Sequence, residues 1–360
     1  MAPRLMTGVL ENRAIQSKLR SRVSDTRRQP GGRIKARFEA RPPQETDRAA
    51  THRKKSAMTL AYWSILVALG SVFGASFGFN EILLSAYGPL TVSAVRVGLG
   101  AIGCWAWVAA TGRRVRLADA SLIAIGTFGI FQYAVPFALL PVAQQHITSS
   151  SAGIANAMTP VAVVLISHLW PGGEQATLSK MAGVGLGVIG MMVLTTQGST
   201  AGISERPWLL VAALAPVCYG IALNLVRKLR GLDPVVMTAC AMTGGAFAIL
   251  PIALVSEGIP QMPGWQLASA FAVIGFGLTS AAFLIMYSIL PKVGATNLSL
   301  VTLVAPVSAT LIGAGFFGEH IGDGHLTGMA LILTGLIAID GRICRALASR
   351  LSGKSVRADP

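Results

Sequence analysis

The stretch PVAVVLISHLWPGGEQATLSKMAGVGLGVIG, residues 160–190, has a second copy in the same chain, PVSATLIGAGFFGEHIGDGHLTGMALILTG, residues 306–335. Each copy begins at a proline and contains the pattern Glu-x8-Gly-x6-Gly. The glutamates and glycines lie 145 residues from their partners, the first prolines lie 146 apart, and Pro89 and Pro234 repeat the offset of 145. A constant offset at so many positions indicates that one structural unit was duplicated. The matched positions are Pro160 and Pro306, Glu174 and Glu319, Gly183 and Gly328, and Gly190 and Gly335.

The composition places this duplicated unit in a membrane. Apolar residues make up 52% of the chain and charged residues only 12%, whereas soluble domains contain about 25% charged residues. The 40 glycines fit helices that pack closely in lipid. The 4 cysteines include no Cys-x-x-Cys pair, so the sequence indicates neither a zinc site nor a disulfide framework, and we expect no cofactor.

The net charge of +15 is concentrated in the N-terminal tail. Residues 1–55 contain 15 Lys and Arg against 5 Asp and Glu, which gives +10 of the total. Residues 1–57 lack apolar periodicity and the apolar core of a signal peptide, so we expect a basic disordered tail. Three explanations stay open: a cytoplasmic tail attracted to anionic lipid, a transit peptide, or sequence upstream of a true start at Met58.

Ten apolar runs follow, each near the roughly 20 residues that a membrane helix needs. The spacers are short and rich in turn residues, and none could form a soluble domain. We therefore predict an all-α integral membrane protein with five-helix units over residues 60–197 and 206–341 and a basic cytoplasmic tail over 342–360. The expected helices cover about 60–80, 89–110, 118–140, 149–170, 178–196, 207–227, 234–255, 265–287, 294–317 and 324–341.

The basic residues of the loops predict the topology, because Lys and Arg are retained on the cytoplasmic side. With the N-terminus inside, thirteen of the fourteen basic residues in the loops and C-terminal tail are cytoplasmic, and only Arg206 is outside. Because each unit has an odd number of helices, the second unit enters the membrane upside down. The result is an inverted repeat, an arrangement that supports alternating access. We expect a multi-pass protein of the cytoplasmic membrane with both termini inside.

These motifs together resemble the drug/metabolite transporter superfamily, specifically its EamA-type permeases with two EamA domains. The resemblance covers about residues 60–341 and rests on Pro89 and Arg96 of the second run and on the two proline–glutamate–glycine patterns. The tryptophan usual before the first-helix glycine is absent, where Leu69 and Gly70 stand, which leaves the substrate subgroup open. The resemblance implies a secondary transporter that moves a small polar metabolite, often an amino acid or related compound and frequently outward.

Arg96 is the residue whose place in the membrane most needs an explanation. It lies seven residues into the second helix, roughly 10 Å along the axis from Pro89, where an arginine costs about 2.5–3.5 kcal/mol on insertion scales. One interpretation is that it binds a substrate carboxylate or sets the potential of the cavity. The other is a structural anchor on backbone carbonyls or a side chain that extends to the membrane surface. The second unit has Ala241 at the equivalent position.

Pro160 and Pro306 lie in the middle of the fourth helix of each unit, where a proline removes a backbone hydrogen bond and can kink the helix. In lipid such a break persists only against protein or a water-filled cavity, so both prolines point to the interface between the units. Besides Arg96, the expected substrate-binding side chains, each with interhelical hydrogen bonding as its alternative role, are Gln132, Tyr133, Asn156, Tyr219, Asn224 and Thr302.

The glycines and the repeated glutamates are expected to be structural. Gly70, Gly74 and Gly78 recur every four residues, a spacing that lets helices approach closely. The glutamates of the two repeats follow their helices at the bilayer edge, as caps or interface residues, with a gating role as the alternative. The expected structural or hinge positions are Pro160, Pro306, Gly183, Gly190, Gly328 and Gly335.

An enzyme is the main alternative from another class. The five histidines have no metal-ligand spacing, and no Gly-x4-Gly-Lys-Ser/Thr stretch exists for ATP hydrolysis. The driving force must then come from a gradient or an exchanged solute. For proton coupling the nearest carboxylate is Glu81, which is otherwise a solvated residue at the end of the first helix. Transport of a drug, nucleoside or sugar derivative, a channel, and a scaffold or receptor also stay open, as does a homodimer. The expected partners are a small-molecule substrate and the lipid bilayer, and not nucleic acid.

Overall fold

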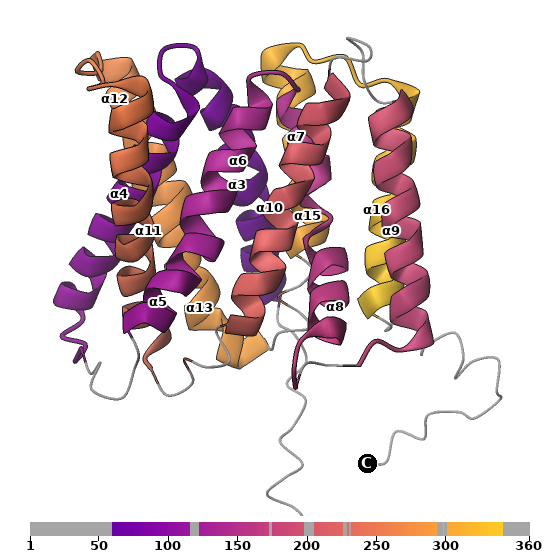
Figure 1. Cartoon of the computed structure of the whole chain (residues 1–360), viewed down its shortest axis with the longest axis horizontal. Coiled ribbons are helices and arrows are strands. Elements are labelled where there is room, and N and C mark those ends of the chain that lie inside the picture. The colour runs from indigo at the N-terminus through magenta and orange to yellow at the C-terminus, as the bar shows by residue number, and fades with distance from the viewer. Residues whose placement is uncertain are drawn as a thin grey trace, which may run out of the picture. The chain divides into compact units, whose positions relative to one another are not determined.

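A computed structural model of the chain describes residues 60–115, 122–172, 175–197, 205–225, 229, 232–293, 298 and 301–340. The predicted N-terminal and C-terminal tails and Glu174 lie outside these residues. Every regular element within them is helical (Figure 1). The first unit contains α3 (Leu60–Leu84), α4 (Pro89–Ala110), a third span of α5 (Leu122–Gly129), η1 (Ile130–Ala134) and α6 (Val135–Gln144), a fourth of α7 (Ser149–Asn156) and α8 (Thr159–Leu169), and α9 (Leu178–Gln197).

The second unit follows the same plan. It contains α10 (Arg206–Leu225), α11 (Pro234–Glu257), a third span of α12 (Trp265–Ala272), η4 (Val273–Ala281) and α13 (Ala282–Val293), then α15 (Val301–Phe317) and α16 (Asp323–Asp340). Among the described residues, 8 spans are long and apolar enough to cross a membrane, and α15 and α16 are shorter apolar helices. The prediction of ten transmembrane helices is confirmed, with the first and third spans each ending four residues later than expected.

The helices of the two units pair as a two-fold axis requires. The fifth helices, α9 and α16, pack on each other, and so do the second helices, α4 and α11. The first helix of one unit packs on the fourth span of the other in both directions, α3 on α15 and α10 on α8. The contact between a first helix and a fourth span thus occurs twice, as expected when two units are related by a two-fold axis. The units form the predicted inverted repeat.

The repeated glycines set the register of α9 against α16. A Cβ atom added at Gly183 would lie 2.5 Å from the carbonyl oxygen of Gly335, and one added at Gly328 would lie 2.9 Å from that of Gly190. The first glycine of each copy therefore meets the second glycine of the other copy. Helices can approach this closely only where no side chain intervenes. The Gly-x6-Gly part of the repeated pattern is thus one contact surface between the two units.

A second glycine surface joins α3 to α15. A Cβ atom at Gly74 would lie 2.6 Å from the carbonyl oxygen of Ala305, and one at Gly70 would lie 2.5 Å from the Cβ of Val304. The predicted packing role of these glycines is confirmed.

The fourth spans of the two units differ at their prolines. In the first unit the span is broken between α7 and α8, and Pro160 lies in the first turn of α8, where its missing N–H would be unpaired in any case. In the second unit Pro306 lies inside the continuous helix α15. The sequence predicted a mid-helix position for both prolines, and at Pro160 the helix is interrupted rather than merely kinked.

The third span of each unit contains a π-helical segment. η1 starts at Ile130 and η4 covers the residues 145 positions later. Such segments widen a helix locally and occur frequently at functional sites. The duplicated unit therefore includes this irregularity.

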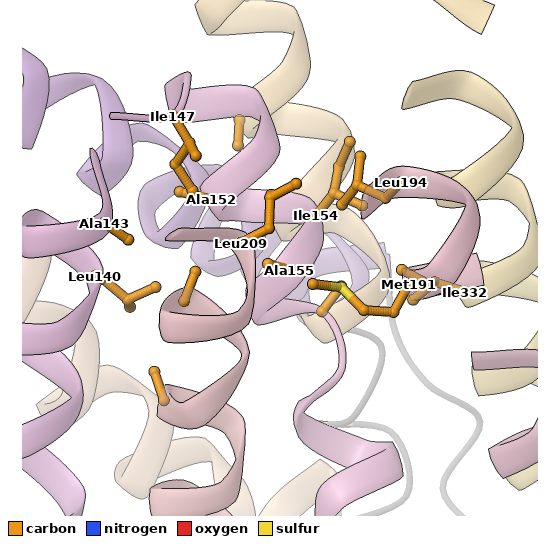
Figure 2. Close-up of a cluster of buried hydrophobic side chains, with 14 of the residues drawn as sticks. Leu140, Ala143, Ile147, Ala152, Ile154, Ala155, Met191, Leu194, Leu209 and Ile332 are labelled. Atoms are coloured by element: carbon orange, nitrogen blue, oxygen red, sulfur yellow. The ribbon is translucent and has the colours of Figure 1, made fainter. Parts of the chain in front are cut away.

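Buried apolar side chains fill the space around α7 (Figure 2). Ile154 of α7 packs with Leu194 of α9, Leu209 of α10 and Ile332 of α16 in one cluster, and all four are at most 1% exposed. A second cluster lies between α4, the third span of the first unit, α10, α11 and α13. The two clusters meet at α10, whose Tyr219 packs against both.

The glycine register predicts a contrast between two neighbouring positions of α9. Gly183→Ala should destabilise the protein by about 1–3 kcal/mol, because the added methyl group overpacks against the backbone of α16. Gly185→Ala is the matched control, since a Cβ atom there meets nothing within 4 Å, and it should be neutral or stabilising by up to about 1 kcal/mol. Thermal unfolding of both variants in detergent measures the difference. Equal melting temperatures would contradict the register.

Candidate functional site

Arg96 is bound between three helices other than its own. Its side chain is 7% exposed. Nε donates a hydrogen bond to Thr279 Oγ1 of η4 at 3.0 Å, and Nη2 donates to Ser76 Oγ of α3 at 3.2 Å. The guanidinium carbon lies 4.2 Å from the ring centroid of Phe137 in α6, within the range of a cation–π interaction. The side chain is therefore inside the bundle and does not extend to the membrane surface.

The two hydroxyl groups are oriented to accept from Arg96. Thr279 Oγ1 donates its own proton to the carbonyl oxygen of Ile274 at 2.7 Å, a bond across five residues that follows the π-helical turn. Ser76 Oγ likewise donates to the carbonyl oxygen of Val72 at 3.3 Å. Each hydroxyl group thus donates its proton to a carbonyl of its own helix, and its oxygen accepts a hydrogen bond from the guanidinium. The anchor consists of hydroxyl groups rather than the backbone carbonyls that the sequence suggested.

Arg96 has no acidic partner among the residues that the structure describes. Away from this site, Arg113 Nη1 and Asp233 Oδ2 form a partly exposed ion pair at 2.6 Å. The charge of a buried arginine is costly to leave unpaired, and neutral hydroxyl groups offset only part of that cost. Nη1 of Arg96 takes part in neither of its two hydrogen bonds. A carboxylate binds a guanidinium through two parallel hydrogen bonds, so this is the chemistry that Arg96 offers.

Aromatic side chains surround Arg96 on the side of the third span. Tyr133 is fully buried and packs edge to face on Phe137, the ring beneath the guanidinium. Its hydroxyl group is buried and has no hydrogen-bond partner among the described residues. Tyr133 is therefore one ring removed from Arg96.

Tyr219 approaches Arg96 from α10. It is half-buried and packs against the cluster that contains Val97, the neighbour of Arg96, together with Tyr133 and Phe137. The structure thus brings together three of the predicted residues, Arg96, Tyr133 and Tyr219.

The two predicted asparagines have different surroundings. Asn224 Nδ2 donates to Ser167 Oγ at 3.0 Å and to the carbonyl oxygen of Gly220 at 2.9 Å, so its amide joins α10 to α8. In contrast, Asn156 Oδ1 is buried with no hydrogen-bond partner in the described part of the chain. It lies at the break before Pro160, where a polar ligand group could satisfy it.

Gln132 and Thr302 are half-buried in η1 and α15. Sequence reasoning missed Thr279, Ser76 and Phe137. Thr279 and Ser76 are hydroxyl residues within apolar runs, and this feature could have identified them as candidates for hydrogen bonds inside the bundle. Phe137 carries no signal of its own, because one more phenylalanine in an apolar helix is unremarkable in sequence.

Glu319 caps the N-terminus of α7. One carboxylate oxygen accepts from the backbone N–H of Ser149 at 2.8 Å and the other from that of Ser150 at 3.0 Å. Both serine hydroxyls donate to the same carboxylate. A negative charge at a helix N-terminus is favourable, and the predicted cap role of Glu319 is confirmed. Across the described residues, no cluster of three or more His, Cys, Asp or Glu side chains could bind a metal ion.

The fold and site define a multi-pass membrane transporter of small metabolites. Residues 61–196 and 206–339 match the EamA-like transporter family, and the chain belongs to this family. A probable terminal-alkyne amino-acid exporter of Streptantibioticus cattleyicolor is 26% identical over 295 residues, 79% of this chain and 95% of the relative. An S-adenosylmethionine/S-adenosylhomocysteine transporter of Chlamydia trachomatis is 24% identical over 73% of this chain and 84% of its own length. A solved crystal structure with 21% identity has the same fold, with a TM-score of 0.58, over 78% of this chain and 97% of its own.

The hydroxyl anchor of Arg96 predicts the effect of an isosteric substitution. Thr279→Val removes one acceptor from a buried guanidinium and should lower the free energy of unfolding by about 1–3 kcal/mol. Thr195→Val is the control, because among the described residues the Thr195 hydroxyl bonds only to the carbonyl of Met191 in its own helix. Thermal unfolding in detergent compares the two. A loss at Thr195 as large as that at Thr279 would contradict the anchor.

Proposed function

We propose that the protein is a secondary transporter that exports amino acids or related carboxylates, with Arg96 as the residue that binds the substrate carboxylate. The observation that supports this most is a buried guanidinium held by hydroxyl groups, with no acidic partner among the described residues. A guanidinium fork matches a carboxylate better than any other side chain does. The relatives named as an amino-acid exporter and as an S-adenosylmethionine transporter move solutes of this kind.

Alternating access is the mechanism that the two-fold arrangement favours. In an inverted repeat the two units can exchange conformations, which opens the central site first to one side of the membrane and then to the other. The glycine contacts between α9 and α16 and between α3 and α15 allow helix surfaces without intervening side chains to shift on each other. Such a cycle needs neither a catalytic group nor a cofactor, and we propose a carrier rather than an enzyme or a channel.

For the orientation, we propose the cytoplasmic membrane with both termini inside. The distribution of loop charges supports this, since only Arg206 would lie on the external side. The end of the bundle at which α12 begins, drawn uppermost in Figure 1, is then the external end.

Counterflow into proteoliposomes tests the transport proposal. Vesicles preloaded with an unlabelled solute should take up the same labelled solute, for one or more members of a panel of amino acids and S-adenosylmethionine. Arg96→Ala should reduce this uptake about tenfold or more, because each hydrogen bond between charged groups contributes about 1.5–3 kcal/mol. Arg96→Lys should be nearly as impaired, because lysine lacks the planar fork.

The matched control is Arg113→Ala, which removes the half-exposed partner of Asp233. Surface ion pairs contribute about 0–1 kcal/mol, so transport should stay near that of the unmodified protein. If Arg96→Ala takes up the solute as fast as the unmodified protein does, Arg96 is not part of the substrate site. Labelled uptake that does not respond to the internal solute would exclude a carrier.

A further inference from the structure

Glu81 has a partly buried carboxyl group at the end of α3, the helix that packs on α15, and Gly78 of α3 lies against Phe317, two residues before Glu319. Glu81 lies in the last turn of α3, which extends to Leu84. One of its carboxylate oxygens is buried with no hydrogen-bond partner in the described ranges. Its charged neighbour is the carboxylate of Glu319. Glu81 is therefore not the fully solvated residue that a position at the membrane edge suggested.

A buried histidine lies on the other side of Glu319. His325 is 1% exposed, and its Nε2 is 2.9 Å from Ser151 Oγ. Its Nδ1 is buried and has no hydrogen-bond partner within the described residues. The charged groups that face it are Glu319 and Glu205, and Glu205 is itself buried. This end of the bundle thus encloses three carboxyl groups and one imidazole, with two of these groups incompletely bonded.

The internal repeat distinguishes Glu319, which recurs as a glutamate in the first unit, from Glu81 and His325, which do not recur. The cap residue Glu319 has a counterpart at the matched position of the first unit, so it belongs to the duplicated fold. The positions 145 residues from Glu81 and His325 are Val226 and Lys180. Neither Glu81 nor His325 therefore belongs to the pattern that the two units share.

Polar side chains connect Glu81 to the Arg96 site along α3. Ser76, which accepts from Arg96, is five residues before Glu81 on this helix, about 7.5 Å along the axis. Between them lies the buried Asn80, whose Nδ2 donates to Gln144 Oε1 at 2.9 Å and whose Oδ1 is buried without a partner among the described residues. A change in the position of α3 at Glu81 would thus be transmitted to a ligand of Arg96.

We propose that Glu81 is the proton-binding site of this transporter and that it exchanges one proton for one solute in each cycle. This inference rests on the proposed function. A proton from water on the side facing this end forms an O–H bond with the Glu81 carboxylate. That bond breaks after the conformational change, and the proton passes to water on the opposite side. No electron is transferred, and no other co-reactant is needed.

The surrounding groups account for the coupling. Two ionised carboxylates close together repel each other, so a proton on Glu81 removes the repulsion from Glu319 and lets the cap on α7 stay in place. Loss of the proton restores this repulsion and favours release of the cap, which opens this end of the bundle. His325 and Glu205 face the same groups and modulate the balance of charge.

Two measurements on the purified full chain in proteoliposomes test the proton site. The first is accumulation of a mixture of radiolabelled amino acids driven by a pH gradient. One-for-one exchange of a proton for a zwitterion moves one charge, so with the membrane potential held at zero it supports about tenfold accumulation per pH unit. Glu81→Gln should lose this accumulation but retain counterflow, since counterflow needs no proton gradient. Glu81→Ala should behave alike and replaces Glu81→Gln if that variant fails to fold.

The matched control is Glu257→Gln, a glutamate at the same end of the bundle. Its oxygens accept from the backbone N–H groups of Leu90 and Thr91 at 2.9 and 2.8 Å. Because both oxygens are bonded, this variant should keep the accumulation. Equal accumulation in Glu81→Gln and in the unmodified protein would overturn the proposal, as would counterflow without any pH-driven accumulation in the unmodified protein.

The second measurement needs no solute and separates the proton site from the transport proposal. Infrared difference spectra between acid and neutral pH should contain a carboxyl band that Glu81→Gln lacks and Glu257→Gln retains. If counterflow is absent from the unmodified protein while this band is present, the proposed function fails and the proton site stands. If the band is unchanged in Glu81→Gln, the proton site is overturned whatever the result for transport.

Discussion

The contact between the backbones of α9 and α16 is the constraint on which the rest of the structure depends. In lipid, helices gain nothing from leaving an apolar solvent, so they associate through close packing and hydrogen bonds. Gly183 meets Gly335, and Gly190 meets Gly328, at distances that a side chain would prohibit. These pairs fix the two units in antiparallel register about a two-fold axis. The pairing of α4 with α11 and the reciprocal contacts of the first and fourth spans follow from that axis.

The chemistry does not follow the symmetry of this scaffold. Arg96 is in the first unit, and the equivalent position of the second unit is the fully buried Ala241. Its ligands Ser76 and Thr279 come from different units, so the site is complete only when the units are assembled. Duplication supplied a symmetric frame, and polar residues such as Arg96, which have no counterpart in the other unit, make its centre asymmetric.

The sequence was sufficient for most of the fold because membrane helices and repeats leave strong local signals. Length, hydropathy and the constant offset predicted ten helices in two inverted units, and most expected helix ends lie within a few residues of those observed. The break before Pro160 and the π-helical segments could not be predicted, because both depend on what packs beside the helix. Pro306 shows this directly, since the matched proline leaves α15 continuous.

The site was predictable only in part for the same reason. Arg96 and Glu319 stand out in sequence because a charge in or near a membrane must be explained. Their partners do not, because the hydroxyls of Thr279 and Ser76 become ligands through contacts between helices 183 and 20 residues apart in sequence. Asn224 illustrates the opposite case, a polar residue whose amide is used within the protein to join α10 to α8.

The inverted arrangement can be tested most directly by labelling single cysteines with a membrane-impermeant reagent in intact cells. One cysteine is placed after α4 at Val115 and another after α11 at Ile259, two exposed positions. The account predicts that the cysteine at position 259 is labelled from outside and that the one at 115 is labelled only after the cells are opened. Labelling of both from the same side would contradict the inverted repeat and, with it, the site between the two units.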